Sequence, residues 1–107
     1  MQAGVGKEVR LIRIEDVIYF ESDSRYTRVV YADGGHQYDA LLRTPLRDLL
    51  AQLHPARFQQ VHRSTVVAST QIASALRDDD GGMRLRLRGS ADTLTVSRPF
   101  QGLFKAQ

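Results

Sequence analysis

Short runs of β-branched, aromatic and alternating apolar residues, separated by turn signals, make up most of this chain. Such runs are typical of antiparallel β structure. The expected strands cover residues 9–14, 17–20, 27–31, 36–42, 61–68, 71–76, 83–87 and 93–96. The clearest hairpin contains Gly34 and Gly35, because glycine tolerates the positive φ that a tight hairpin turn requires. The pattern therefore predicts a mainly β fold.

Two helical segments are expected among these strands. The first covers about residues 44–53, where Thr44 supplies an N-cap, Pro45 occupies the first turn and leucines follow at helical spacing. The second is short and begins near Ser97, ahead of an apolar stripe. The first helix carries a single arginine, Arg47, on its polar face, so it lacks the basic surface of a helix that reads the major groove. If this chain binds DNA, loops and strand ends must make the contacts.

The 107 residues suit one domain and are too few for two. No apolar run reaches the roughly 18 residues of a membrane span, so no membrane association is expected. Without cysteine, neither a disulfide nor a thiolate metal site can form, and the three histidines lack ligand spacing, so neither a metal nor a cofactor is expected. Residues 1–6 do not resemble a secretory signal. They are expected to be a flexible leader or an artificial boundary before a folded domain at 7–107.

Arginine dominates the basic residues, with thirteen Arg against two Lys and a net charge of +3. The planar guanidinium can donate two parallel hydrogen bonds to a guanine edge or a phosphate, which lysine cannot do. Arg63 and Arg98 stand where the hydrophobic pattern breaks, and Arg25 and Arg28 lie in a polar stretch. A basic surface forms if folding brings these four together.

Four segments resemble, in order and spacing, the signature segments of LytTR DNA-binding domains. They are Val17-Ile18-Tyr19-Phe20-Glu21-Ser22, Tyr26-Thr27-Arg28, Arg57-Phe58-Gln59-Gln60-Val61-His62-Arg63-Ser64 and Val96-Ser97-Arg98. The resemblance runs from about residue 7 to 105. It implies an elongated fold of about ten strands in antiparallel sheets, with loops entering successive major grooves on one face of the DNA. One position departs from the family pattern, because Ala68 stands where an asparagine is common.

The resemblance also assigns contacts to individual positions. Base reading is expected from Thr27, Arg63 and Arg98. Phosphate or supporting contacts are expected from Ser24, Arg25, Tyr26, Arg28, Arg57, His62, Ser64 and Ser97, with Lys7 as a further candidate for a phosphate. One alternative comes from the hairpin itself, because Arg28 can instead pair with Asp39 across it.

The function implied by the resemblance is sequence-specific binding of double-stranded DNA, as the output domain of a bacterial response regulator in the cytoplasm. The implied partners are DNA with repeated half-sites, a second copy of the domain on that DNA, and a receiver domain in the parent protein.

Two other function classes stay open at this point. A protein-interaction module would use exposed sheet edges or the C-terminal apolar stripe, and its binding would depend weakly on salt. A hydrolase would use His62 and Ser64, which stand two residues apart on one predicted strand face. No third group is evident to orient the imidazole, and no Gly-x-Ser-x-Gly motif surrounds the serine. We therefore expect no enzymatic activity.

Overall fold

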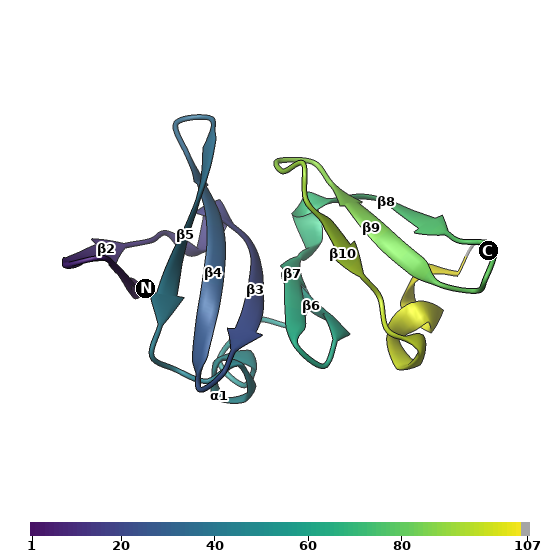
Figure 1. The fold of residues 1–107 in the computed structure, drawn as a ribbon, viewed down its shortest axis with the longest axis horizontal. Coiled ribbons are helices and arrows are strands. Elements are labelled where there is room, and N and C mark those ends of the chain that lie inside the picture. Colours follow the sequence, from purple (N-terminus) through teal and green to yellow (C-terminus); the bar gives the residue numbers. More distant parts are fainter. Residues whose placement is uncertain (106–107) are drawn as a thin grey trace.

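A computed structural model describes residues 1–105 and shows an elongated domain with extents of 44 × 29 × 24 Å (Figure 1). Ten strands form two antiparallel sheets in this part of the chain. The larger sheet has seven strands in the order β2-β1-β5-β4-β3-β7-β6, and the smaller has three in the order β10-β9-β8. The strands are β1 (Gln2–Val5), β2 (Glu8–Leu11), β3 (Val17–Asp23), β4 (Tyr26–Asp33), β5 (His36–Leu42), β6 (Phe58–His62), β7 (Thr65–Ala68), β8 (Ile72–Arg77), β9 (Met83–Leu87) and β10 (Thr93–Thr95). The predicted mainly β, multi-sheet fold is confirmed.

One short α-helix and three 3-10 turns complete the described chain. They are α1 (Leu46–Leu50), η1 (Ile14–Asp16), η2 (Ser69–Gln71) and η3 (Arg98–Phe104). The predicted helix at 44–53 is shorter than expected, because Gln52 and Leu53 donate to carbonyls three residues back and the last turn tightens. Pro45 is the N-cap residue, and no side chain caps the helix. The predicted C-terminal helix is present as η3, with Ser97 as its N-cap.

The single strand predicted over 61–68 is wrong, because these residues belong to the β6–β7 hairpin. Its turn contains Arg63 and Ser64 between His62 and Thr65, which are cross-strand partners. Apolar residues continue on both sides of this two-residue break, so the sequence pattern did not reveal the reversal. The expected strand at 9–14 likewise ends earlier, at Leu11.

The prediction of a flexible leader is also wrong. Residues 2–5 form β1, which pairs with β2 and contacts β5 through Gly4 and Leu41. Ala3 is buried in the core, and the Ile12 amide donates to the Met1 carbonyl at 2.7 Å. Gly6, with φ of +61°, closes the β1–β2 turn. Residues 2–5 are therefore an ordered strand of the larger sheet.

The seven-stranded sheet has a hydrophobic core on each face. In β4 the side chains of Val29 and Val30 point to opposite faces, as strand geometry requires. Val29 packs in the core that α1 covers, together with Phe20 and Leu46. Val30 packs in the core between the two sheets, where Leu85 belongs to the three-stranded sheet. Burial on both sides makes the central strands rigid supports for the turns at their ends.

Candidate nucleic-acid interface

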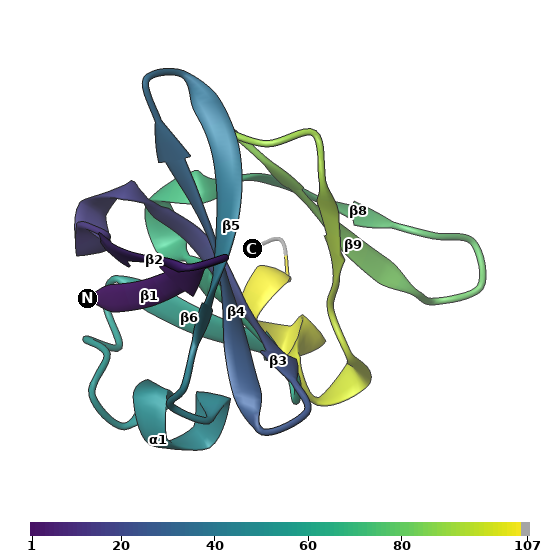
Figure 2. The same ribbon diagram turned by 60° about the vertical axis from the view of Figure 1, so that its left-hand side comes forward.

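Three turns that are distant in the sequence lie along the lower edge of the domain in Figure 1, next to α1. They are the β3–β4 turn, the β6–β7 turn and the junction between β10 and η3. The rotated view in Figure 2 keeps the β3–β4 turn, α1 and η3 at the same edge. Hydrogen bonds connect the segments, because the Ser22 amide donates to the Ser64 carbonyl and the Ser97 amide donates to the Val61 carbonyl, both at 2.9 Å. We call this surface the turn edge.

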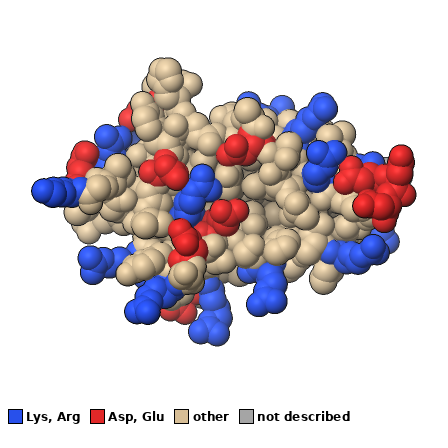
Figure 3. All heavy atoms as spheres, viewed as in Figure 1, with Lys and Arg blue, Asp and Glu red and all other residues tan. Residues whose placement is uncertain are grey.

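Basic side chains project from the turn edge, whereas acidic side chains gather at the right-hand end of the domain and on the face shown in Figure 3. Arg25, Arg63 and Arg98 belong to the three turns, and all are exposed. Within residues 1–105 none of the three takes part in an ion pair. The charges of Arg25 and Arg63 are therefore available to an external anion, whereas the Arg98 guanidinium extends over the turn that contains Gly81.

The β3–β4 turn is a two-residue reversal between Asp23 and Tyr26, which are cross-strand partners. Ser24 has φ of 56°, a conformation that non-glycine residues seldom adopt. Ser24, Arg25 and Tyr26 are all exposed, and 41% of the surface of Tyr26 is accessible. These three residues therefore lie at an accessible loop tip.

Thr27 does not share this exposure. It is completely buried, and its hydroxyl donates a 2.7 Å hydrogen bond to the carbonyl of Thr44. A side chain with no exposed surface cannot contact a base, so this structure contradicts the predicted base-reading role. Thr27 instead fastens β4 to the segment that leads into α1.

Arg28 is half-buried and engaged within the protein. Its Nε donates to Asp39 at 2.9 Å, its Nη1 lies 3.5 Å from Glu21, and the guanidinium stacks 5.9 Å from the ring centre of Tyr19. The hydrogen bond to Asp39 raises the pKa of Arg28. The cross-hairpin pairing considered from the sequence is thus present. Because two carboxylates already neutralise this cation, it has little charge to offer a phosphate.

The β6–β7 turn is held by His62. The Ser64 amide donates to His62 Nδ1 at 3.2 Å, and the Ser64 hydroxyl lies 2.8 Å from the same nitrogen. An Nδ1 that accepts from a backbone amide leaves the ring hydrogen on Nε2. Both side chains therefore support the turn that presents Arg63. No carboxylate among the described residues hydrogen-bonds to this imidazole, so the third member of a hydrolase triad has no counterpart here.

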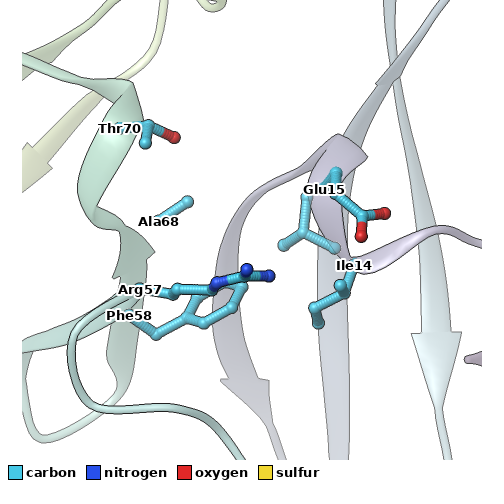
Figure 4. A pocket seen from close by; sticks show the side chains of 7 residues that line it. Ile14, Glu15, Arg57, Phe58, Ala68 and Thr70 are labelled. Carbon is cyan, nitrogen blue, oxygen red and sulfur yellow. The ribbon is translucent and has the colours of Figure 1, made fainter.

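Arg57 lies away from the turn edge, at the opposite end of β6 from Arg63. The two positions are six residues apart along the strand direction, or about 20 Å if the chain is extended. Arg57 lines a pocket of about 310 Å³ (Figure 4), where its guanidinium points across toward Ile14 and Glu15. Arg57 is therefore not part of the turn edge, and its expected DNA contact stays a prediction. Ala68 lines the same pocket.

At the third turn, Ser97 is partly exposed and Arg98 is exposed. The Arg98 Nη2 extends over the β8–β9 turn, 3.9 Å from where a side chain on Gly81 would begin. Phe100 and Phe104, two residues of the C-terminal apolar stripe, pack against the core between the sheets. The stripe is thus largely used inside the domain, and Leu103 alone of its members is exposed.

Two observations concern metal binding and membrane spans. Among residues 1–105 there is no cluster of three or more His, Cys, Asp or Glu side chains that could hold a metal ion. No helix in the same range is long and apolar enough to cross a membrane.

Comparison with known proteins agrees with this architecture. Residues 7–107 match the LytTr DNA-binding domain family. The structure superposes on the LytTr DNA-binding domain of a Bacillus cereus protein with a TM-score of 0.83 and 16% sequence identity, covering 96% of this chain and 90% of that one. That likeness confirms the fold.

Curated relatives of this chain are regulators. A response regulatory protein of Vibrio cholerae is 36% identical over 98% of this chain and 40% of its own length. The positive alginate biosynthesis regulatory protein of Pseudomonas aeruginosa is 35% identical over 92% of this chain and 38% of its own length. The CO-responsive transcriptional regulator RcoM of Rhodospirillum rubrum is 30% identical over 89% of this chain and 39% of its own length. The chain spans about two fifths of the length of these relatives. Since the family match covers nearly all of it, the chain belongs to the LytTR DNA-binding domain family, a family of DNA-binding domains and not of enzymes.

Proposed function

We propose that this domain binds double-stranded DNA sequence-specifically, as the output domain of a bacterial response regulator that controls transcription in the cytoplasm. The observation that carries the proposal is the turn edge. Three exposed turns there present Arg25, Arg63 and Arg98 without an internal acidic partner in the described chain. The family membership and the regulatory relatives support the same function.

Arg63 and Arg98 are the proposed base-reading residues. A guanidinium at the tip of a rigid turn can form two hydrogen bonds with the O6 and N7 atoms of guanine, and such a pair discriminates against other bases by about 1–3 kcal/mol. His62 and Ser64 hold the first of these arginines in place, and Ser97 precedes the second. We further propose that the loops of the turn edge enter successive major grooves on one face of the duplex.

The β3–β4 turn supplies positioning contacts in this proposal. Arg25 neutralises a phosphate, Tyr26 lies against a sugar, and Ser24 offers a hydroxyl beside them. Contacts to the backbone set orientation and affinity without reading sequence. Thr27 and Arg28 contribute indirectly, because both are occupied by partners inside the domain.

The proposed assembly contains two copies of the domain on repeated half-sites, each joined to a receiver domain in the parent protein. The length of the relatives supports a further domain, since this chain matches only 40% of the Vibrio cholerae response regulatory protein.

The test selects bound sequences from a random duplex pool with three proteins. These are the wild type, Arg63→Ala, and the control Arg13→Ala, which removes an exposed arginine beside η1. We expect a repeated motif to be enriched by the wild type and the control and to be lost with Arg63→Ala. Fluorescence anisotropy at two salt concentrations should show an affinity that falls steeply with salt. Unchanged discrimination in Arg63→Ala overturns the base-reading assignment, and weak binding indifferent to salt favours an interaction module.

A further inference from the structure

An open groove of about 680 Å³ lies beside the β3–β4 turn. The β1–β2 hairpin forms one wall and contributes Lys7 and Glu8. The end of β5 and the segment that leads into α1 form the other wall and contribute Leu41 and Arg43. Tyr26, at the start of β4, belongs both to this lining and to the turn edge. The groove is therefore continuous with the proposed DNA-reading surface.

The charge of this groove is positive. Lys7 and Arg43 are exposed, and neither forms an ion pair with another residue in the described chain. Glu8 is an acidic residue of the lining, and its carboxylate is already engaged by the Arg10 Nε at 3.4 Å. The positive charges of Lys7 and Arg43 are therefore not offset by Glu8, because Arg10 already neutralises that carboxylate.

The groove also has an apolar component. Tyr26 and Leu41 leave 41% and 44% of their surfaces exposed, high values for such large side chains. Cations in the same lining as exposed aromatic and aliphatic surface suit a polymer of phosphates and sugars, because phosphates pair with cations and the sugars can pack on apolar surface. An acidic peptide would use the cations, whereas the continuity with the turn edge favours the nucleic acid already placed there.

The walls of this groove are rigidly placed relative to the β3–β4 turn. The hydroxyl of buried Thr27 bonds to the Thr44 carbonyl, next to Arg43, and Gly4 on β1 is the cross-strand partner of Leu41 on β5. Rigid placement means that DNA seated on the turn edge would meet Lys7 and Arg43 without a change in the protein backbone.

We propose that this groove binds the sugar–phosphate backbone of the duplex beyond the bases read by the turn edge, with Lys7 and Arg43 each neutralising one phosphate. The inference rests on the proposed function and extends it to Arg43, to a shared groove for Arg43 and the earlier phosphate candidate Lys7, and to a flanking stretch of DNA. The groove adds affinity to every sequence alike, because it contacts no base.

The test measures the dependence of affinity on salt for Lys7→Ala, Arg43→Ala, the double variant and the control Arg13→Ala. The probes are a long duplex carrying the selected motif, a long random duplex, and motif duplexes shortened stepwise from either end. On both long duplexes each single variant should lower the slope of log K against log salt by about 0.9, and the double variant by about 1.8, while the control keeps the wild-type slope. Arg43→Lys should retain the slope, because lysine also neutralises a phosphate.

The shortened duplexes locate the contact. The difference between wild type and Arg43→Ala should vanish once base pairs are removed from one end, with the selected motif still intact. A wild-type slope in both single variants overturns the inference, as does a difference that persists on every shortened duplex. The proposed function fails separately, through the absence of an enriched motif with the wild type. Thermal unfolding of each variant confirms that the fold is unchanged.

Discussion

The hydroxyl of Tyr19 on β3 donates a 2.9 Å hydrogen bond to the carboxylate of Asp92, which precedes β10, 73 residues later in the chain. Gln37 on β5 donates to the same carboxylate at 3.0 Å, and Arg28 donates to the Tyr19 oxygen at 3.4 Å. Burial raises the pKa of Tyr19, so the hydroxyl keeps its proton and remains a donor. This network joins the sheet that carries the β3–β4 turn to the sheet that leads into η3. The network therefore helps to fix the distance between the β3–β4 turn and the junction of β10 with η3.

Replacement of Tyr19 by phenylalanine should destabilise the domain by about 1–2 kcal/mol, because it removes a hydrogen bond to a charged group while keeping the ring. Urea denaturation measures the loss. Tyr38→Phe is the matched control, since Tyr38 is 42% exposed and its hydroxyl makes no hydrogen bond to another described residue. Equal losses in the two variants would contradict a stabilising role for the Tyr19–Asp92 bond.

The contribution of Asp92 should depend on pH. A hydrogen bond from Gln37, and to a smaller extent one from Tyr19, holds the pKa of this carboxyl below its ordinary value. A group whose pKa is lowered by folding stabilises the protein above its unfolded pKa, which is about 4, and that stability is lost as the pH falls through the folded value. The stability advantage of wild type over Asp92→Asn should therefore be full at pH 7 and shrink below about pH 4. Denaturant titrations across this range test it, and a constant difference would contradict the assignment.

Replacement of Thr27 by valine should lower stability by about 1–2 kcal/mol and leave the selected DNA motif unchanged. The physical reason is that the Thr44 carbonyl loses its donor, while the buried position contacts no base. Thr27→Ser retains the hydroxyl and should keep this hydrogen bond. Sequence selection and chemical denaturation are the two measurements. An altered motif with unchanged stability would restore the base-reading role that the resemblance assigned to this position.

Removal of the Arg57 guanidinium should leave DNA binding unaltered. Arg57→Ala acts at the far end of β6, about 20 Å of extended chain from Arg63, so no phosphate contact is lost. Its affinity and salt slope should equal those of wild type in anisotropy titrations, whereas Arg25→Ala should lower the slope by about 0.9. A reduced slope in Arg57→Ala would show that the DNA reaches the pocket beside η1.

Most strands were predictable because their signals are local. The hairpin between β4 and β5 follows from its two glycines, both with positive φ, and β9 follows from alternation of buried leucines with exposed arginines. The helix start was placed correctly to within two residues, yet its length was overestimated, because the tightening of its last turn depends on backbone hydrogen bonds that leucine spacing does not encode.

The groove beside the β3–β4 turn was missed for a specific reason. Its β1 wall had no strand signal in its small, glycine-containing segment and was expected to be a flexible leader. Arg43 lies between a predicted strand and a predicted helix, but a single arginine in such a position does not predict a groove unless the β1–β2 hairpin is known to lie opposite it. Only the pairing of β1 with β2 and β5 places Lys7 across from it.

From residue types and spacing alone, the sequence determined the β class, the family resemblance and the exposed arginines at two breaks in the hydrophobic pattern, because these follow from local periodicity and composition. Tertiary structure decided which of the polar residues share a surface. It buried Thr27, paired Arg28 with Asp39 and separated Arg57 from Arg63. The physical reason is that burial and ion pairing depend on strand order and register, which place residues from distant segments in contact and which no short stretch of sequence encodes.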